Sequence, residues 1–238
     1  MNLVIDIGNT SIKAALFDDN KMIKHHTFLK LSLKELITFT DDYQVPKTII
    51  SSVQKQNQMT EEIVRHFNAL YFSHKTAIPI SSNYKTPETL GTDRVAAIVG
   101  INNEYPNQNA LSIDVGSCIT YDYFIKESYL GGRISPGLKM RFDALHHFTN
   151  QLPELSISDT HFTIGIDTDS SIIAGVQQGA LEEIDTIIYN FRKENQDAIV
   201  ILSGGDYKFF EKHLKNSIFA DPFIVLKGLN TILKFNAK

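Results

Sequence analysis

Two short apolar runs in this chain each end in an aspartate, a glycine and small polar residues. The first run covers residues 3–10 and contains Asp6, and the second covers residues 111–117 and contains Asp114. Val and Ile predict buried strands, and the glycine predicts a tight turn with exposed backbone N–H groups. Such a turn beside a carboxylate suits a metal-bound polyphosphate: the amides face phosphate oxygens, and the carboxylate faces Mg²⁺ directly or through water. Aspartate and glycine also make ordinary turns, but the repetition favours phosphate binding.

A third glycine-rich turn, Ser203-Gly204-Gly205-Asp206, follows a predicted strand at residues 198–203. Three such turns could hold one nucleotide across a cleft. Phosphoryl transfer needs mainly positioning, charge neutralisation and a carboxylate near the acceptor hydroxyl. Asp93, in Gly91-Thr92-Asp93-Arg94, is a candidate for that carboxylate, although this motif alone is also typical of a solvated, ion-rich helix turn. The patterns predict an ATP-using phosphotransferase or ATPase and leave its substrate open.

The chain contains no G-x-x-x-x-G-K-[ST] loop, no G-x-G-x-x-G fingerprint and no G-x-S-x-G elbow, and no His or Cys spacing matches a zinc site. Its 238 residues are 42% hydrophobic and 21% charged, as in ordinary soluble proteins. The net charge of −4 gives no general attraction to nucleic acid or to anionic membranes. One cysteine, no signal peptide and no apolar span predict a cytoplasmic protein without membrane or nucleic-acid partners.

The hydrophobic pattern predicts an α/β fold of two similar halves facing each other across a cleft. The first half is predicted to run βββαβαβ, with a capping box at Ser32 and Glu35 and a further helix over residues 86–100. A polar stretch at residues 102–109 reads as the connection. The second half again begins βββα. We therefore expect an N-terminal domain at residues 1–105 and a C-terminal domain at residues 106–238, which includes a terminal helix over residues 225–235.

Several of these motifs together resemble the type III pantothenate kinases, within the acetate kinase/sugar kinase/Hsp70/actin superfamily. Asp6-Ile7-Gly8-Asn9-Thr10 is similar to the family's D-x-G-N-T motif, and Gly91-Thr92-Asp93-Arg94 to its G-x-D-R motif. Residues 131–137 are similar to its G-G-x-I-x-P-G stretch. The resemblance covers nearly the whole chain. It implies two tandem ribonuclease H-like (actin-like ATPase) domains, each beginning with a βββ meander, with a cleft between them.

The resemblance also implies an activity and a set of site residues. The activity is phosphorylation of pantothenate by ATP, the first step of coenzyme A synthesis, with Mg²⁺ and a monovalent cation, K⁺ or NH₄⁺, in a homodimer. Asp93 is implied as the general base, and Asp122 as the ligand of the monovalent cation. The implied ATP site, where Asp6 and Asp114 also face Mg²⁺, consists of Asp6, Gly8, Asn9, Thr10, Lys13, Asp114, Gly116, Ser117, Gly204 and Gly205. The implied pantothenate site consists of Tyr84, Gly91, Thr92, Arg94 and Thr168, the last contributed across the dimer interface.

The sequence departs from the family pattern at four positions. Ser117 replaces a threonine in the second phosphate motif and keeps its hydroxyl, Cys118 replaces an alanine, Ser203 replaces the threonine of T-G-G, and Asp167 replaces an asparagine before Thr168. Two rival functions stay open. One is a nucleotide-binding regulatory protein, like family members first described as accessory transcription factors, and the other is a kinase of another small alcohol. A regulatory protein that only binds nucleotide, without transferring phosphate, has no need of Asp93 beside Tyr84 and Arg94.

Overall fold

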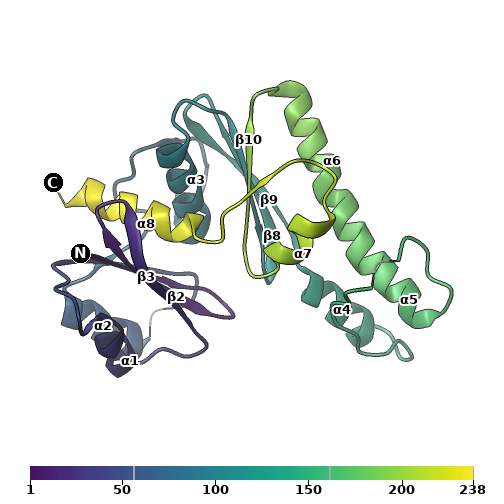
Figure 1. The fold of residues 1–238 in the computed structure, drawn as a ribbon, viewed down its shortest axis with the longest axis horizontal. Helices are drawn as coiled ribbons and strands as arrows, with labels where there is room; N and C mark the ends of the chain where they lie inside the picture. Colours follow the sequence, from purple (N-terminus) through teal and green to yellow (C-terminus); the bar gives the residue numbers. More distant parts are fainter. Residues whose placement is uncertain (56, 161, 238) are drawn as a thin grey trace. The chain divides into compact units, whose positions relative to one another are not determined.

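The computed structural model describes residues 1–55, 57–160 and 162–237. These residues form two compact units (Figure 1). The first unit comprises Met1–Asn107, Phe124–Gly131 and Phe223–Lys238, and the second comprises Gln108–Tyr123 and Gly132–Pro222.

The first unit is built on a five-stranded sheet with the strand order β3-β2-β1-β4-β5. The central strand β1 pairs antiparallel with β2 and parallel with β4. Its strands are β1 (Asn2–Ile7), β2 (Ile12–Asp18), β3 (Lys21–Phe28), β4 (Lys47–Ser52) and β5 (Leu70–Tyr71). The two helices after β3 and β4 are α1 (Leu33–Thr40) and α2 (Gln58–Phe67). The predicted order βββαβα is confirmed, but the last strand of this sheet, expected at residues 78–81, lies at Leu70–Tyr71 instead.

Helices cover both faces of this sheet, so the first unit has three layers. Side chains alternate along β1, and Leu3, Ile5 and Ile7 pack in one core cluster with residues of α1 and α2. Val4 points to the opposite cluster, which contains residues of α3 (Thr92–Glu104) and α8 (Ile224–Asn236). Both faces of β1 are buried, and this explains why its sequence is an almost continuous apolar run.

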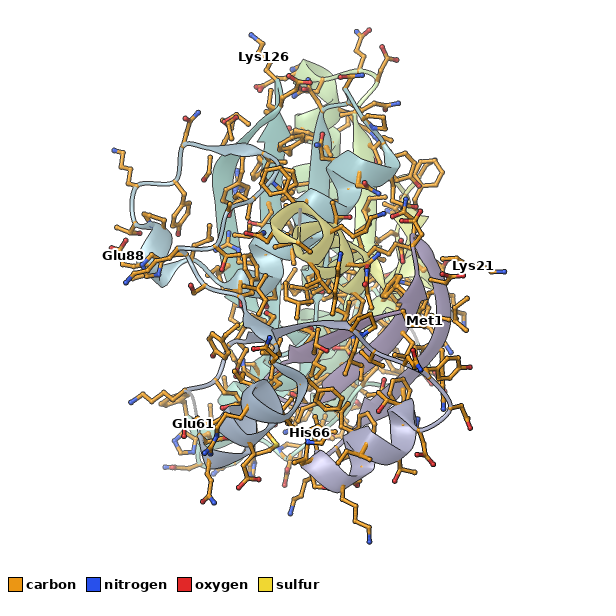
Figure 2. The ribbon with its side chains drawn as sticks, turned by 90° about the vertical axis from the view of Figure 1, so that its left-hand side faces the viewer. Met1, Lys21, Glu61, His66, Glu88 and Lys126 are labelled. Carbon is orange, nitrogen blue, oxygen red and sulfur yellow. The ribbon has the colours of Figure 1, made fainter. Side chains whose placement is uncertain are left out.

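Local signals fix the ends of the helices. The predicted capping box is present at α1, where Glu35 N–H donates to Ser32 Oγ at 3.2 Å and Ser32 N–H donates to the Glu35 carboxylate at 2.8 Å. The helix expected over residues 86–100 is wrong in its start: a 3₁₀ turn, Pro87–Thr89, is followed by an extended Leu90, and α3 begins at Thr92. Glu88 projects from that turn, away from the ribbon (Figure 2). Consequently residues 91–94 form the beginning of α3.

The terminal helix α8 packs in the first unit, whereas the expected C-terminal domain at residues 106–238 included it. The reason is a close helix–helix contact at two glycines. A Cβ atom added to Gly228 would lie 1.7 Å from the carbonyl oxygen of Ala96, and one added to Gly100 would lie 2.4 Å from that of Ile224. Only glycine permits such an approach of two helix backbones. The other end of the first stretch, Asn107, lies near the expected boundary.

The second unit is arranged on a sheet with the order β11-β10-β7-β8-β9-β6, in which β10 is parallel to β7 and β11. Strands β8 and β9 contribute residues to both units, and β6 pairs with the part of β9 that belongs to the first unit. Lys126 marks the turn between β8 and β9 (Figure 2). These strands are β6 (Ser81–Ser82), β7 (Ala110–Val115), β8 (Cys118–Ile125), β9 (Ser128–Pro136), β10 (Ile199–Ser203) and β11 (Phe219–Ala220).

A long helical segment lies beside the strands of the second unit (Figure 1). It consists of α5 (Thr168–Ile173), a π-helical turn (Ala174–Gln178) and α6 (Gly179–Glu194). The ring of Phe191 in α6 contacts that of Tyr123 in β8, with centroids 5.6 Å apart. The remaining helices are α4 (Leu138–His147) and α7 (Tyr207–His213). Among the described residues, no helix has the length and apolar character to cross a bilayer.

Candidate active site

The turn between β1 and β2 is closed by its own backbone. Gly8 N–H donates to the carbonyl of Ser11 at 3.1 Å, and the carbonyl of Gly8 accepts from the Gln54 side chain at 2.7 Å. Asn9 and Thr10 are exposed at the tip of this turn. Lys13 is half-buried on β2, and it pairs in register with Asp6 on β1. The turn thus presents an amide and a hydroxyl to an incoming anion.

Asp6 lies on the face of the sheet that packs against α3. It has the same parity on β1 as Val4, and it is only 9% exposed. Its partner in register on the parallel strand β4 is Ser51, which is fully buried. The Ser51 hydroxyl is hydrogen-bonded to the Thr92 hydroxyl at 2.8 Å. Since register partners on neighbouring strands are about 5 Å apart, Asp6 and the first residues of α3 share one corner of the first unit.

Asp93 occupies the first turn of α3, directly after Thr92. Its Oδ1 accepts the backbone N–H of Arg94 at 2.9 Å, which folds the carboxylate back over the beginning of the helix. A Cβ atom added to Gly91 would lie 2.5 Å from that oxygen. Gly91 therefore leaves the space that the Asp93 carboxylate occupies. The helix N-terminus also stabilises a negative charge there.

Two further residues of the predicted acceptor site have ordered surroundings in the first unit. Arg94 is buried, being 8% exposed. The Tyr84 ring stacks on Tyr129 with centroids 5.9 Å apart, and it contacts the backbone at Gly131, where an added Cβ would lie 3.3 Å from the ring. Gly131 has φ of +111°, a conformation that favours glycine. Gly131 is the first residue of the G-G-x-I-x-P-G stretch.

Asp114 is the penultimate residue of strand β7 in the second unit. Its Oδ2 accepts a hydrogen bond from the hydroxyl of Ser203, its partner in register on β10, at 2.8 Å. The following turn is closed by Gly116 N–H, which donates to the carbonyl of Cys118 at 2.9 Å, and Ser117 is exposed. The second and third predicted turns, at Asp114 and Ser203, are thus neighbours.

Gly204 and Asp206 bring the third turn onto the end of β7. Gly204 has φ of +101°, and a Cβ atom there would lie 2.3 Å from the carbonyl oxygen of Val115. Asp206 N–H donates to that same carbonyl at 2.9 Å. Burial and the nearby charge of Asp114 raise the pKa of the Asp206 carboxyl above its usual range. Gly205 is exposed and has open space beside it.

Gly137 holds the Gly116–Ser117 turn from another side. Its N–H donates to the carbonyl of Ser117 at 3.2 Å, and a Cβ atom added to it would lie 2.0 Å from the carbonyl oxygen of Gly116. Gly137 is also the N-cap of α4. The last glycine of the G-G-x-I-x-P-G stretch is therefore in contact with the second predicted phosphate turn.

Asp122 and Thr168 also belong to the second unit. Asp122 is on β8 and only 1% exposed. Thr168 is the first residue of α5 and lines a pocket of about 700 Å³ with Leu145, Ile166 and Gly175, among others. Asp167, before it, is the N-cap of α5 and accepts the N–H of Ser170 at 2.8 Å. Aspartate and asparagine are equally good at this position.

The sequence did not single out Ser51, Asp206 or Gly137 as functional. Ser51 is one polar residue in an apolar strand, and nothing in the sequence tells that it faces α3. Asp206 is the last residue of the third glycine-rich turn, and Gly137 is the last residue of the G-G-x-I-x-P-G stretch. The glycines of these two motifs are the sequence feature that could have indicated their role. Among the described residues, no cluster of three or more His, Cys, Asp or Glu side chains forms a metal site. Carboxylate, hydroxyl and backbone oxygens at Asp6 and at Asp114 are nonetheless the donors that Mg²⁺ prefers.

Comparisons with known proteins agree with these motifs. The sequence model described as type III pantothenate kinase matches residues 2–190. A type III pantothenate kinase of Phocaeicola vulgatus is 42% identical over 241 residues and covers 100% of both chains. A solved ROK family glucokinase from Streptomyces griseus shares the fold, with a TM-score of 0.51, 9% identity and 99% of each chain covered. A conserved Campylobacter jejuni protein, provisionally described as a Baf family transcriptional activator, has a TM-score of 0.63, 22% identity and coverage of 99% and 98%.

Proposed function

The chain belongs to the type III pantothenate kinase family, and from this premise we propose how its residues transfer phosphate. The enzyme phosphorylates pantothenate with ATP in coenzyme A biosynthesis. The fold is that of two ribonuclease H-like domains, as in actin-like ATPases and ROK sugar kinases. The regulatory alternative is not favoured, because the relatives that match over the full length are named as kinases.

Asp93 is the proton acceptor of this proposal. The bond between the γ-phosphorus of ATP and the bridging oxygen breaks, a new bond forms to the primary hydroxyl oxygen of pantothenate, and the hydroxyl proton passes to Asp93. The observation that carries this role is the hydrogen bond between Ser51 and Thr92, which fixes the beginning of α3 beside the strand end that bears Asp6. Gly91 leaves room for the carboxylate. A carboxylate of this kind acts mainly by orienting the hydroxyl and accepting its proton late.

The two acidic turns serve the nucleotide. We assign the phosphates of ATP to the turn of Gly8, Asn9 and Thr10 and to the turn of Gly116 and Ser117, with Lys13, Gly204 and Gly205 contributing to the same ligand. Asp6 and Asp114 would hold Mg²⁺, directly or through water. When bound, Mg²⁺ neutralises charge on the phosphate oxygens. That both aspartates act on one triphosphate stays a prediction.

Tyr84, Gly91, Thr92 and Arg94 form the proposed pantothenate site. A buried guanidinium at Arg94 suits the carboxylate of pantothenate, since arginine binds carboxylates through two parallel hydrogen bonds. Tyr84, held by Tyr129 and the Gly131 backbone, provides a rigid wall.

A homodimer and a monovalent cation complete the proposal. Exposed apolar side chains precede the beginning of α5: Ile164 is 81% exposed and Ile166 93%. Such a patch is unusual on a monomer and typical of an interface, and it adjoins Thr168, which we propose contacts pantothenate in the partner subunit. Asp122 is the proposed ligand of K⁺ or NH₄⁺. Its carboxylate is only 1% exposed, and a buried negative charge is stabilised by a cation beside it. Cytoplasmic localisation and the absence of nucleic-acid and membrane partners stay predictions.

Formation of phosphopantothenate tests the substrate. Purified protein with Mg-ATP and K⁺ is expected to release ADP with pantothenate, in equal amounts with 4′-phosphopantothenate detected by mass spectrometry. Glycerol and glucose serve as control acceptors. Stimulation by another alcohol and none by pantothenate would assign the enzyme to that alcohol.

The solution mass tests the dimer. We expect twice the chain mass of 26.8 kDa by light scattering, and the variant Ile166→Glu is expected to be monomeric. A wild-type monomer at micromolar concentration would contradict the interface. The exposed substitution Tyr189→Glu, on α6, is the matched control for an added surface charge.

A further inference from the structure

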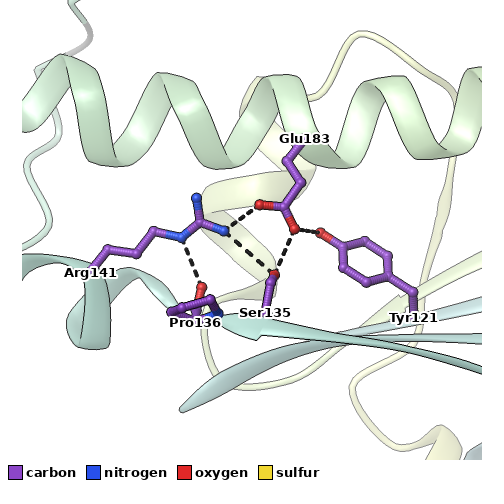
Figure 3. A network of polar contacts seen from close by, with 5 residues as sticks. All are labelled: Tyr121, Ser135, Pro136, Arg141 and Glu183. Atoms are coloured by element: carbon purple, nitrogen blue, oxygen red, sulfur yellow. Dashed lines mark hydrogen bonds and ion pairs between the residues drawn. The ribbon is translucent and has the colours of Figure 1, made fainter.

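A polar network in the second unit connects four elements at Glu183, on α6. The hydroxyl groups of Tyr121 and Ser135 donate to Glu183 Oε1 at 2.8 and 2.6 Å. Arg141 Nη2 forms an ion pair with the other carboxylate oxygen, and Arg141 Nε donates to the carbonyl of Pro136 at 2.8 Å. Figure 3 shows Glu183 pointing from its helix toward the other members of this network.

The network continues to the second phosphate turn. Ser135 and Pro136 directly precede Gly137, and Gly137 N–H donates to the carbonyl of Ser117. Glu183 accepts from Ser135, and Arg141 donates to Pro136. These two bonds hold the segment directly before Gly137, which packs against Gly116 and Ser117. Because a Cβ atom at Gly137 would lie only 2.0 Å from the Gly116 carbonyl oxygen, the two backbones are in close contact, and a displacement of this segment would be passed to the turn.

The network is sheltered and electrostatically matched. Tyr121 is fully buried, and the side chains of Arg141 and Glu183 are 20% and 29% exposed. Burial alone would raise the pKa of the Glu183 carboxyl, but the hydrogen bonds from Arg141, Ser135 and Tyr121 together hold it below its usual range. Burial and the neighbouring Glu183 raise the pKa of Tyr121, so its hydroxyl stays a donor. A charged carboxylate with three donors fixes geometry more firmly than a neutral contact.

We propose that Glu183 is a positioning residue for ATP, which sets the Gly116–Ser117 turn through Arg141, Ser135 and the Pro136–Gly137 backbone. Glu183 does not touch the reacting atoms in this proposal. The inference rests on the proposed function only in assigning ATP phosphates to that turn. It gives the helix α6, whose sequence reads as ordinary amphipathic helix, a part in nucleotide binding.

The test compares two branches of the network in the full-length protein. The Kd of a non-hydrolysable ATP analogue with Mg²⁺ is measured by calorimetry without pantothenate, and KM values are measured for both substrates. Glu183→Gln and Ser135→Ala are expected to raise the analogue Kd and the ATP KM about tenfold, with the pantothenate KM changed less than twofold. Arg141→Lys is expected to behave likewise, because one ammonium cannot reach both Pro136 and Glu183. Tyr121→Phe removes a hydrogen bond to the Glu183 carboxylate but leaves the bonds to Ser135 and Pro136, which lead to the turn. Its Kd for the ATP analogue is therefore expected to stay within twofold of the wild-type value.

The control on the same helix is Glu182→Gln, since Glu182 is an exposed neighbour that bonds only to Gln178 among the hydrogen bonds described. Unchanged ATP affinity in Ser135→Ala and Arg141→Lys would overturn the proposal. Equal weakening of both substrates in all variants, including Tyr121→Phe, would do so too, because it would indicate a general structural role. Wild-type protein that binds the analogue but leaves pantothenate unphosphorylated would instead count against the proposed function and leave this inference standing.

Discussion

The hydroxyl oxygens of Ser51 and Thr92 lie 2.8 Å apart and join the end of strand β4 to the first residue of helix α3. Ser51 is fully buried beside Asp6, and Thr92 precedes Asp93. One hydrogen bond between two neutral side chains thereby connects the strand that bears the proposed metal-facing carboxylate with the helix that bears the proposed base. It is one of the contacts that set the relative placement of Asp6 and Asp93.

Ser51→Ala is expected to lower the free energy of unfolding by about 1 kcal/mol, because it removes this hydrogen bond from a buried site. We also expect kcat to fall several-fold, since the beginning of α3 loses its hydrogen bond to the sheet next to Asp93. Urea unfolding and steady-state kinetics measure the two effects. Thr38→Ala, which removes an exposed hydroxyl bonded to the Lys34 carbonyl within α1, is the control. A kcat equal to that of the wild type in Ser51→Ala would show that the bond has no part in placing Asp93.

Gly91→Ala is expected to reduce kcat about ten- to a hundredfold while the protein stays folded. The added methyl carbon would lie 2.5 Å from Asp93 Oδ1, so the carboxylate must move away from the place where it would meet the hydroxyl. Gly179→Ala, in α6, is the control, because a Cβ there meets nothing within 4 Å. That substitution should keep full activity and stabilise the helix by about 0.5–1 kcal/mol. Full activity in Gly91→Ala would contradict the role of the glycine.

Asp206→Asn is expected to stabilise the ligand-free protein at neutral pH. Burial and Asp114 raise the pKa of Asp206 above its ordinary 3.8, so the folded state holds this proton more tightly than the unfolded state does. The resulting stability is complete below pH 3.8 and is lost as pH rises through the raised pKa. The melting temperature of the variant should therefore exceed that of the wild type at pH 8 in Mg²⁺-free buffer, and the difference should shrink toward pH 4. The exposed substitution Asp197→Asn is the control. A melting temperature of the variant below that of the wild type at pH 8 would contradict the proposed repulsion between Asp206 and Asp114.

Asp122→Asn is expected to abolish stimulation by K⁺ and NH₄⁺. The wild-type rate should rise as K⁺ replaces Na⁺ at constant ionic strength, because the proposed cation binds the buried carboxylate. The variant should show a low rate that is insensitive to this exchange. Glu127→Gln, an exposed change in the turn between β8 and β9, should keep the wild-type response. A K⁺ response retained in Asp122→Asn would place the cation elsewhere.

The sequence predicted the strands of both acidic turns and the capping box at Ser32, because these depend on neighbouring residues. It placed the start of the third helix too early, since Pro87 and Glu88 form a 3₁₀ turn that also satisfies helix-start preferences. The location of α8 could not be predicted, because it depends on the contact between Gly100 and Gly228, which are 128 residues apart in the chain. The role of Glu183 could not be predicted for the same reason, because its hydrogen-bond and ion-pair partners lie on three other elements.

Turnover by Asp93→Asn tests the central claim most directly. ADP and 4′-phosphopantothenate are measured for this variant and for the wild type at saturating ATP, pantothenate and K⁺, with Kd for the ATP analogue measured in parallel. Glu88→Gln, an exposed carboxylate five residues away, is the control. The expected result is a fall in kcat of about 10²–10³-fold in Asp93→Asn, with an unchanged Kd for the analogue and full activity in the control. A wild-type kcat in Asp93→Asn would contradict its role as the proton acceptor.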